Sequence, residues 1–166
     1  MALVDALLPE FDREMATTRT VLERVPEEKF DWKPHAKSFS LGALATHVAT
    51  LPTWATETLT RAVIDIDPNQ QPPSALPSRQ DLLTAFDANV GAARAALAGK
   101  TDAELLAMWA LTRGGRTLFT MPKTAVLRSF VLNHLVHHRG QLTVYLRLLD
   151  VPVPSVYGPS ADEPAF

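Results

Sequence analysis

The stretch NHLVHHRGQ, residues 133–141, places His134 and His138 four residues apart in a segment with helical periodicity. Side chains at positions i and i+4 project from the same face of a helix, and neutral imidazole is the commonest protein ligand for metal ions. A third histidine, His47, lies in a different helical segment. If the two segments face each other, three imidazoles can hold one metal ion and leave coordination positions open. That arrangement suits a catalytic metal better than a structural one.

The segment around these histidines is the last of four predicted helices. Apolar residues recur at three- and four-residue steps, the spacing of one buried helix face, over residues 2–24, 40–64, 78–99 and 122–149. Ser40 and Ser78 are the predicted N-caps of the second and third helices. Pro9 either begins or kinks the first helix, and Pro52 interrupts the second. We therefore predict an all-α fold, a four-helix bundle.

Three other segments lack the helical pattern. Residues 65–77 form a stiff, proline-rich loop. Residues 109–120 place Gly114 and Gly115 between β-prone residues, which predicts a short β-hairpin between the third and fourth helices. Residues 151–166 contain four prolines and are predicted to be an extended C-terminal tail. A chain of 166 residues is expected to form one domain over residues 1–166.

The composition excludes several classes of protein. The net charge is −2 and no long basic stretch occurs, so nucleic-acid binding is not expected. The chain has no cysteine, which excludes disulfides, Cys-type zinc sites and thiolate nucleophiles and fits a reducing compartment. We find no signal peptide and no apolar run of about 18 residues, so we expect no membrane span and a cytoplasmic protein.

A uniform helical rotation of about 100° per residue predicts which histidines point inward. Counted from Val131, it puts His138 in the centre of the buried stripe, His134 roughly 60° to one side and His137 about 120° away. We predict that Arg139 faces away from this stripe. His47 lies about 60° from the centre of its own stripe and can face a neighbouring helix. The alternative without metal is a polar network of the buried histidines, Gln141 and water.

Other polar and aromatic residues are weaker candidates for the site. Asp31 and Tyr145 are candidate helpers at the metal, although Tyr145 is more simply a core aromatic. Asn133 and Gln141 are candidate acceptors for the second ring nitrogen of a ligand. Arg113 and Arg116 are candidate anion binders, but a solvated hairpin tip is preferred, and Trp32, Trp54 and Trp109 are expected to be packing residues.

Three stretches together resemble the DinB family, within the DinB/YfiT-like superfamily. They are the run from His134 to Leu142, the connector VPEEKFDWKPHAKSFSLG (25–42) leading into His47, and the tail motifs VPVP (151–154) and YGPSADE (157–163). The resemblance covers nearly the whole chain. It implies a four-helix bundle that is often dimeric, and a divalent metal, variously nickel, zinc, iron or manganese, held by His47, His134 and His138. His137 corresponds to a neighbour that does not bind the metal.

The resemblance also implies two kinds of chemistry, because some members are thiol-dependent transferases or isomerases and others are described only as metal-dependent hydrolases. A divalent cation on three neutral imidazoles acidifies a bound water or deprotonates a bound thiol. We therefore expect a metal-dependent enzyme, a hydrolase or a thiol S-transferase, acting on a small molecule, with a low-molecular-weight thiol as one candidate. The alternative is a non-catalytic metal-binding, structural or stress-response protein.

Overall fold

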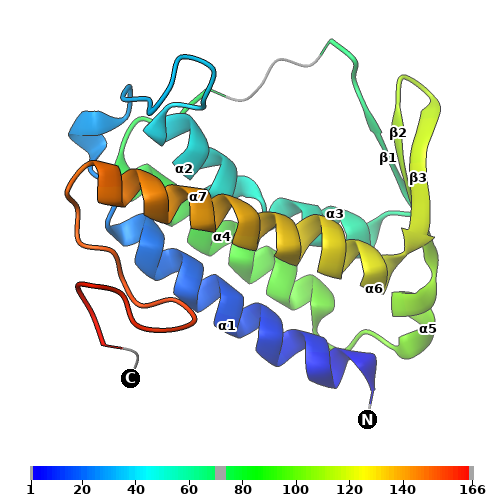
Figure 1. Cartoon of the computed structure of the whole chain (residues 1–166). Coiled ribbons are helices and arrows are strands. Elements are labelled where there is room, and N and C mark those ends of the chain that lie inside the picture. The colour runs from blue at the N-terminus through cyan, green and yellow to red at the C-terminus, as the bar shows by residue number, and fades with distance from the viewer. Residues whose placement is uncertain (1, 70–73, 165–166) are drawn as a thin grey trace.

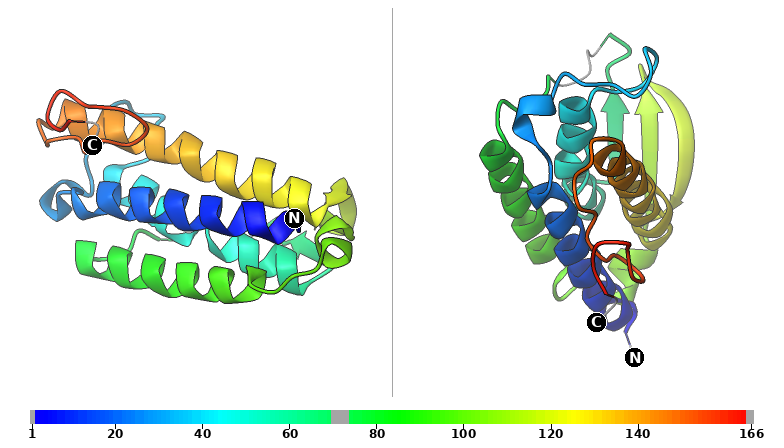
Figure 2. Two further views of the ribbon diagram at one scale, coloured as in Figure 1. Left: turned by 90° about the horizontal axis from the view of Figure 1, so that it is seen from below. Right: turned by 60° about the vertical axis from the view of Figure 1, so that its left-hand side comes forward.

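The computed structural model describes residues 2–69 and 74–164 and is mostly helical, with a three-stranded sheet at one end (Figure 1). The helices are α1 (Leu3–Glu23), α2 (Leu41–Thr50), α3 (Thr53–Thr60), α4 (Arg79–Leu97), α5 (Asp102–Leu106), α6 (Lys123–Val126) and α7 (Asn133–Leu148). Helix α7 packs against α1 and α2, and α4 packs against α1, α2 and α3, so the long helices surround a common apolar core (Figure 2).

Local signals in the sequence predict most of the helix boundaries correctly. The hydroxyl of Ser40 accepts a hydrogen bond from the Ala43 amide at the start of α2, and the hydroxyl of Ser78 accepts one from the Asp81 amide at the start of α4. Both are the N-caps that the sequence predicts. Pro9 lies inside α1 rather than at its start.

The predicted helix over residues 40–64 is confirmed up to Thr60, including its interruption at Pro52, and is wrong over its last four residues. It is divided around Pro52 into α2 and α3, and α3 ends at Thr60. Residues Val63–Ile66 form strand β1 instead of the last helical turn and the start of a loop. Three of these four residues are β-branched, and they pair in parallel with strand β2 from Val63↔Ala110 onward. The fold is therefore not all-α.

The predicted hairpin is present. Strand β2 (Met108–Arg113) pairs antiparallel with β3 (Arg116–Pro122), and the sheet has the order β1-β2-β3. The two turn residues, Gly114 and Gly115, have φ values of 56° and 78°. A two-residue turn with positive φ at both positions matches the twist of a hairpin, and glycine adopts it without steric cost. The sheet packs on the helices through a second small core around Trp109 and Val126.

The predicted fourth helix, residues 122–149, is continuous but not uniform. A π-helical segment, η2 (Leu127–Leu132), joins α6 to α7. Counted at about 100° per residue, the buried stripe of α7 is centred about 50° from Val131, on the side away from His134. The buried side chains of α7 are Leu135, Arg139, Leu142 and Leu146. The prediction that Arg139 faces outward is therefore wrong: Arg139 is 1% exposed.

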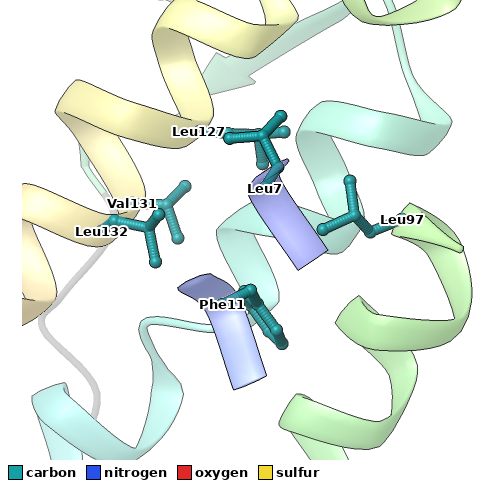
Figure 3. A pocket seen from close by; sticks show the side chains of 6 residues that line it. All are labelled: Leu7, Phe11, Leu97, Leu127, Val131 and Leu132. Atoms are coloured by element: carbon teal, nitrogen blue, oxygen red, sulfur yellow. The ribbon is translucent and has the colours of Figure 1, made fainter. Parts of the chain in front are cut away.

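The main core is closely packed where α1, α4 and η2 meet. A void of about 10 Å³ lies there and is lined entirely by apolar side chains. Figure 3 shows them: Leu7, Phe11, Leu97, Leu127, Val131 and Leu132. A buried water needs about this much space and also polar partners, which this lining does not offer. The void is therefore a packing defect of the core rather than a binding site.

The C-terminal tail runs back along the helices without a helix or strand between residues 151 and 164, as predicted (Figure 1). The end of the predicted tail, residues 165–166, lies outside the described residues. The tail is held by Tyr157, whose hydroxyl donates a hydrogen bond to Glu14 of α1 at 2.8 Å. No helix among the described residues combines the length and apolar character needed to cross a membrane.

Candidate metal centre

His47, His134 and His138 converge between α2 and the N-terminal half of α7. Each offers one ring nitrogen to a cluster in which the three atoms lie within 4.8 Å of one another. Nε2 of His134 is 3.4 Å from Nε2 of His47 and 2.9 Å from Nε2 of His138. The imidazoles predicted from the sequence thus meet at one point, although they come from separate elements 87 residues apart in the chain.

His47 is positioned by the connector that precedes α2. The amide of Leu41 donates a hydrogen bond to the Trp32 carbonyl, and the amide of Gly42 donates one to the Phe30 carbonyl, both at 2.9 Å. A Cβ at Gly42 would lie only 3.0 Å from the Phe30 side chain, so glycine allows this close approach. The Trp32 ring in turn meets Tyr145 of α7 edge-on at 5.5 Å. The connector therefore fixes the start of α2 relative to α7.

His134 and His138 are positioned by the rotation of α7 about its axis. Arg139, the residue after His138, is held in the interior by an ion pair with Glu14 of α1 at 2.8 Å and by a hydrogen bond to the Thr18 hydroxyl at 3.1 Å. With Arg139 turned toward α1, the two histidines lie on the flank of the buried stripe and not, as predicted for His138, at its centre. That flank faces α2 and His47.

All three rings are held in the neutral form that binds metal. Burial, followed by the charges of His138 and His134, lowers the pKa of His47 from 6.5 to about 4. Burial is also the largest cause that lowers the pKa of His134 and of His138. Desolvation disfavours the imidazolium ion, so at neutral pH these rings carry lone pairs rather than charge.

Gln141 determines which nitrogen of His138 carries the proton. Its side-chain carbonyl oxygen lies 2.7 Å from Nδ1 of His138 and can only accept, so Nδ1–H is the donor and Nε2 keeps a lone pair. For His134, burial lowers the pKa and the Phe130 carbonyl partly opposes this, while the buried Nδ1 has no hydrogen-bond partner among the described residues. The second ring nitrogen of a metal-binding histidine normally meets such an acceptor.

Two of the three separations between Nε2 atoms match those of ligands on one metal ion. Two nitrogens that each lie about 2.0–2.1 Å from a metal are separated by about 2.9 Å at a right angle and about 3.4 Å at a tetrahedral angle. The measured separations of 2.9 and 3.4 Å fall at these values. Among the described residues, this cluster holds three imidazoles and no Asp, Glu or Cys, which matches the donor set of an open site.

Two hollows adjoin the histidines, one at His47 and one at His138. The larger, of about 630 Å³, includes His47 and extends between α3 and β1. The smaller, of about 220 Å³, includes His138 and Gln141 together with Tyr145 and connector residues around Phe39. Volumes of a few hundred cubic ångströms hold small molecules, so the centre is accessible to a ligand and is not sealed by side chains.

The weaker candidates have mostly structural positions. Asp31, Asn133 and His137 are exposed and lie outside the histidine cluster, and the hydroxyl of Tyr145 donates to the Phe39 carbonyl at 3.3 Å. Arg113 and Arg116 are exposed at the hairpin.

The tryptophans pack as predicted. Trp32 meets Tyr145, Trp54 meets Phe130 edge-on at 5.2 Å, and Trp109 is fully buried.

Two residues of the larger hollow, Glu57 and Arg61, were missed by reasoning from the sequence. They continue the face of α2 and α3 that carries His47, since positions 47, 50, 54, 57 and 61 recur at three- and four-residue steps. That spacing is a signal visible in the sequence. It points to a shared face but not to the strand that closes the hollow.

The chain is similar to known proteins over almost its whole length. The sequence profile of the DinB family matches residues 2–165. The crystal structure of a DinB-like protein from Bacillus cereus aligns with a TM-score of 0.71 and 22% identity, covering 92% of this chain and 97% of that one. A DinB-like protein from Bacillus subtilis aligns with a TM-score of 0.66 and 19% identity, covering 87% and 92%.

A curated relative matches over a shorter stretch. The uncharacterized protein YrdA of Bacillus subtilis is 44% identical over 43 residues, which is 26% of this chain and 25% of that protein. The match therefore spans about a quarter of the relative's length.

Proposed function

The chain belongs to the DinB family, and we propose that it binds one divalent metal ion through His47, His134 and His138 and uses it as a metal-dependent enzyme. The observation that carries this proposal is the convergence of three neutral imidazoles, with ring nitrogens within 4.8 Å of one another, beside two hollows. The metal is nickel, zinc, iron or manganese, and imidazole ligands alone do not select among them.

The chemistry follows from the donor set. A divalent cation on three neutral ligands keeps most of its charge and supplies a water or thiol nucleophile at neutral pH. The reaction is thus a hydrolysis or a thiol S-transfer on a small molecule, with a low-molecular-weight thiol as the cosubstrate in the second case. The described residues place no carboxylate in the histidine cluster, so the chain itself offers no acid–base group there beyond the imidazoles.

The protein residues have separate tasks in this proposal. The histidines bind the ion, and Gln141 keeps the His138 lone pair directed at it. The Arg139–Glu14 ion pair holds the rotation of α7, and the connector from Phe30 to Ser40 holds α2. Because α7 and α2 are each held by contacts outside the histidine cluster, the histidines are oriented before any ion binds.

The remaining features belong to the same proposal. We treat residues 1–166 as one domain whose helices form a four-helix bundle of the DinB/YfiT-like type with the sheet appended. We also propose a cytoplasmic homodimer. The absence of cysteine is consistent with the cytoplasm, and the exposed Val144 and Leu148 on α7 supply apolar surface for contact between subunits.

The test begins with elemental analysis of the protein purified from its native host, followed by titration of metal-free protein with each of the four ions. One ion per chain is expected. Metal-loaded protein is then assayed with low-molecular-weight thiols plus electrophiles, and with panels of esters and amides. Metal binding without turnover on any panel favours the second candidate, a non-catalytic metal-binding, structural or stress-response protein. Failure to bind any ion rejects both and leaves a histidine network.

A further inference from the structure

The larger hollow has a shape and a polarity that restrict its ligand. It is lined by His47, Thr50, Thr53, Trp54, Glu57, Arg61, Ile64, Asp65 and Ile66. On its helical side the lining runs along the sequence from His47 in α2 to Arg61, the residue after α3, and these fourteen residues correspond to roughly 20 Å of helix. The hollow is therefore elongated, and only one of its ends adjoins the histidine cluster.

The middle of the hollow is apolar in character. Trp54 is fixed edge-on against Phe130, and Ile64 and Ile66 of β1 pack against the second core. The hydroxyl of Thr53 donates to the Thr50 carbonyl at 2.7 Å, and that of Thr50 donates to carbonyls one turn back in α2. These hydroxyl protons are thus committed to the helix backbone, and the middle of the hollow offers a ligand mainly an aromatic ring and aliphatic carbon.

At the end of the hollow away from His47, the guanidinium group of Arg61 is held at Nε only. Nε of Arg61 contacts Glu57 at 2.7 Å, while the arginine side chain is 63% exposed. Its two Nη nitrogens make no hydrogen bond with any of the described residues. An arginine held through Nε presents its Nη edge to a ligand, and that edge matches the two oxygens of a carboxylate.

Two carboxylates also belong to this lining, those of Glu57, which is paired with Arg61, and of Asp65. The Asp65 carboxylate accepts hydrogen bonds from the Thr112 hydroxyl at 2.7 Å and from the Gly115 amide at 3.1 Å. These contacts hold Asp65 on the sheet side of the hollow. A ligand carboxylate must therefore bind on the α3 side, at Arg61.

We propose that this hollow binds an elongated organic carboxylate. Its carboxylate contacts the Nη edge of Arg61, its apolar body lies against Trp54 and the β1 isoleucines, and its reactive end reaches the three histidines. The location of the reactive end rests on the proposed function. The carboxylate site does not, because it lies at the opposite end of the hollow.

The test uses metal-free protein, so that the probe cannot bind a metal ion instead. The probes are octanoate, octanamide and octylammonium, which share a chain long enough to cover the roughly 10 Å of helix between Arg61 and Trp54. Each is titrated while the indole N–H signal of Trp54 is followed by NMR, with the signal assigned through Trp54→Phe. Arg61→Gln is compared with Arg116→Gln, which removes an exposed arginine outside the hollow.

Octanoate is expected to move the Trp54 signal and to bind about fivefold more tightly than octanamide, the preference of an exposed charged contact. Arg61→Gln should remove that preference, and Arg116→Gln should keep it. The proposal is overturned if octylammonium binds most tightly, if octanoate and octanamide bind equally, or if no probe moves the signal.

Repeating the titration with zinc-loaded protein separates the two proposals. Octanoate that binds only with zinc, and equally well to Arg61→Gln, would reject the carboxylate site and leave the metal centre standing. Binding that depends on Arg61 in a protein that takes up no metal would reject the metal centre and leave the carboxylate site standing.

Discussion

Gln141 accepts a hydrogen bond from Nδ1 of His138 at 2.7 Å, one turn further along α7. Since an amide oxygen cannot donate, this contact selects the tautomer of His138 that leaves Nε2 unprotonated. That lone pair points at Nε2 of His134, 2.9 Å away. Gln141, which lies outside the histidine cluster, thus keeps Nε2 of His138 free to bind a metal ion.

We expect Gln141→Leu to weaken zinc binding by about 10- to 100-fold, the usual effect of losing an outer hydrogen bond to a metal-binding histidine. The leucine leaves the ring free to rotate and to protonate at either nitrogen. Calorimetric titration of metal-free protein measures the change. Asn133→Leu alters an exposed polar residue of the same helix and should leave the affinity unchanged. An unaltered affinity in Gln141→Leu would show that the contact is incidental.

The two adjacent histidines should behave differently. We expect His138→Ala to abolish binding of one metal ion per chain, because its Nε2 belongs to the cluster. His137→Ala should leave binding largely intact, because His137 is exposed and its ring only meets that of His138 edge-on at 4.8 Å. Metal content after dialysis, measured by elemental analysis, distinguishes the two variants. Equal loss in both would refute the ligand assignment.

Local signals explain why much of this fold is predictable. Helix periodicity, the caps Ser40 and Ser78 and the Gly114–Gly115 turn each depend on residues close in sequence, and the structure contains all of them. Strand β1 is different, because Val63–Ile66 pairs with residues from Ala110 onward. Nothing near Val63 in the sequence indicates a partner 47 residues away, so the sequence predicts a helix up to residue 64 although α3 ends at Thr60.

At the candidate site too, features set by residues close in sequence are predictable, and features set by distant segments are not. The i, i+4 spacing of His134 and His138 and the family resemblance together identify the histidines. Taking Val131 as the centre of the stripe puts that centre about 50° from its position in α7, and it therefore leaves Arg139 outside the stripe. Arg61 went unnoticed as a binding residue because the hollow beside it exists only once β1 is in place.

The low pKa of His47 makes the stability of metal-free protein depend on pH. The unfolded chain protonates this ring near its ordinary pKa of 6.5, but the folded protein does so only near 4. Between these values the unfolded state binds the extra proton, so stability should fall as the pH decreases from 6.5 to 4 and this contribution should level off below 4. Urea unfolding at a series of pH values measures the slope.

The matched variant for this prediction is His47→Gln, which removes the titrating ring. Protonation of acidic groups also destabilises the protein as the pH falls. Glu104, whose pKa is lowered from 4.5 to about 2 by Lys100 and Thr101, contributes at a lower pH, between 4.5 and 2. The difference between wild type and variant should therefore appear mainly between pH 4 and 6.5. Identical slopes in the two proteins over that range would contradict the role of His47.

The buried Arg139–Glu14 pair should be costly to break from one side. Arg139→Met is expected to destabilise the protein by about 3–5 kcal/mol, because the carboxylate of Glu14 remains in the interior without its partner. The double variant Arg139→Met, Glu14→Leu should recover most of the loss. Arg147→Met breaks the half-exposed ion pair with Asp162 on the same helix and should cost less than about 1 kcal/mol. Similar losses in Arg139→Met and Arg147→Met would mean that burial of the pair is unimportant.

Gly42→Ala tests whether the connector fixes α2. A Cβ at this position would lie 3.0 Å from Cβ and Cγ of Phe30, so the connector or the helix must move. We expect a loss of about 1–3 kcal/mol from overpacking, together with weaker zinc binding as His47 shifts. Gly91→Ala in α4 is the matched control, because a Cβ there meets no neighbouring atom within 4 Å.

The control should gain about 0.5–1 kcal/mol from the better helix propensity of alanine. The same propensity favours alanine at position 42, so a net loss there isolates the contact with Phe30. Thermal unfolding and zinc titration of both variants give the comparison. If Gly42→Ala is as stable as Gly91→Ala and binds zinc normally, the close approach of the connector does not position His47.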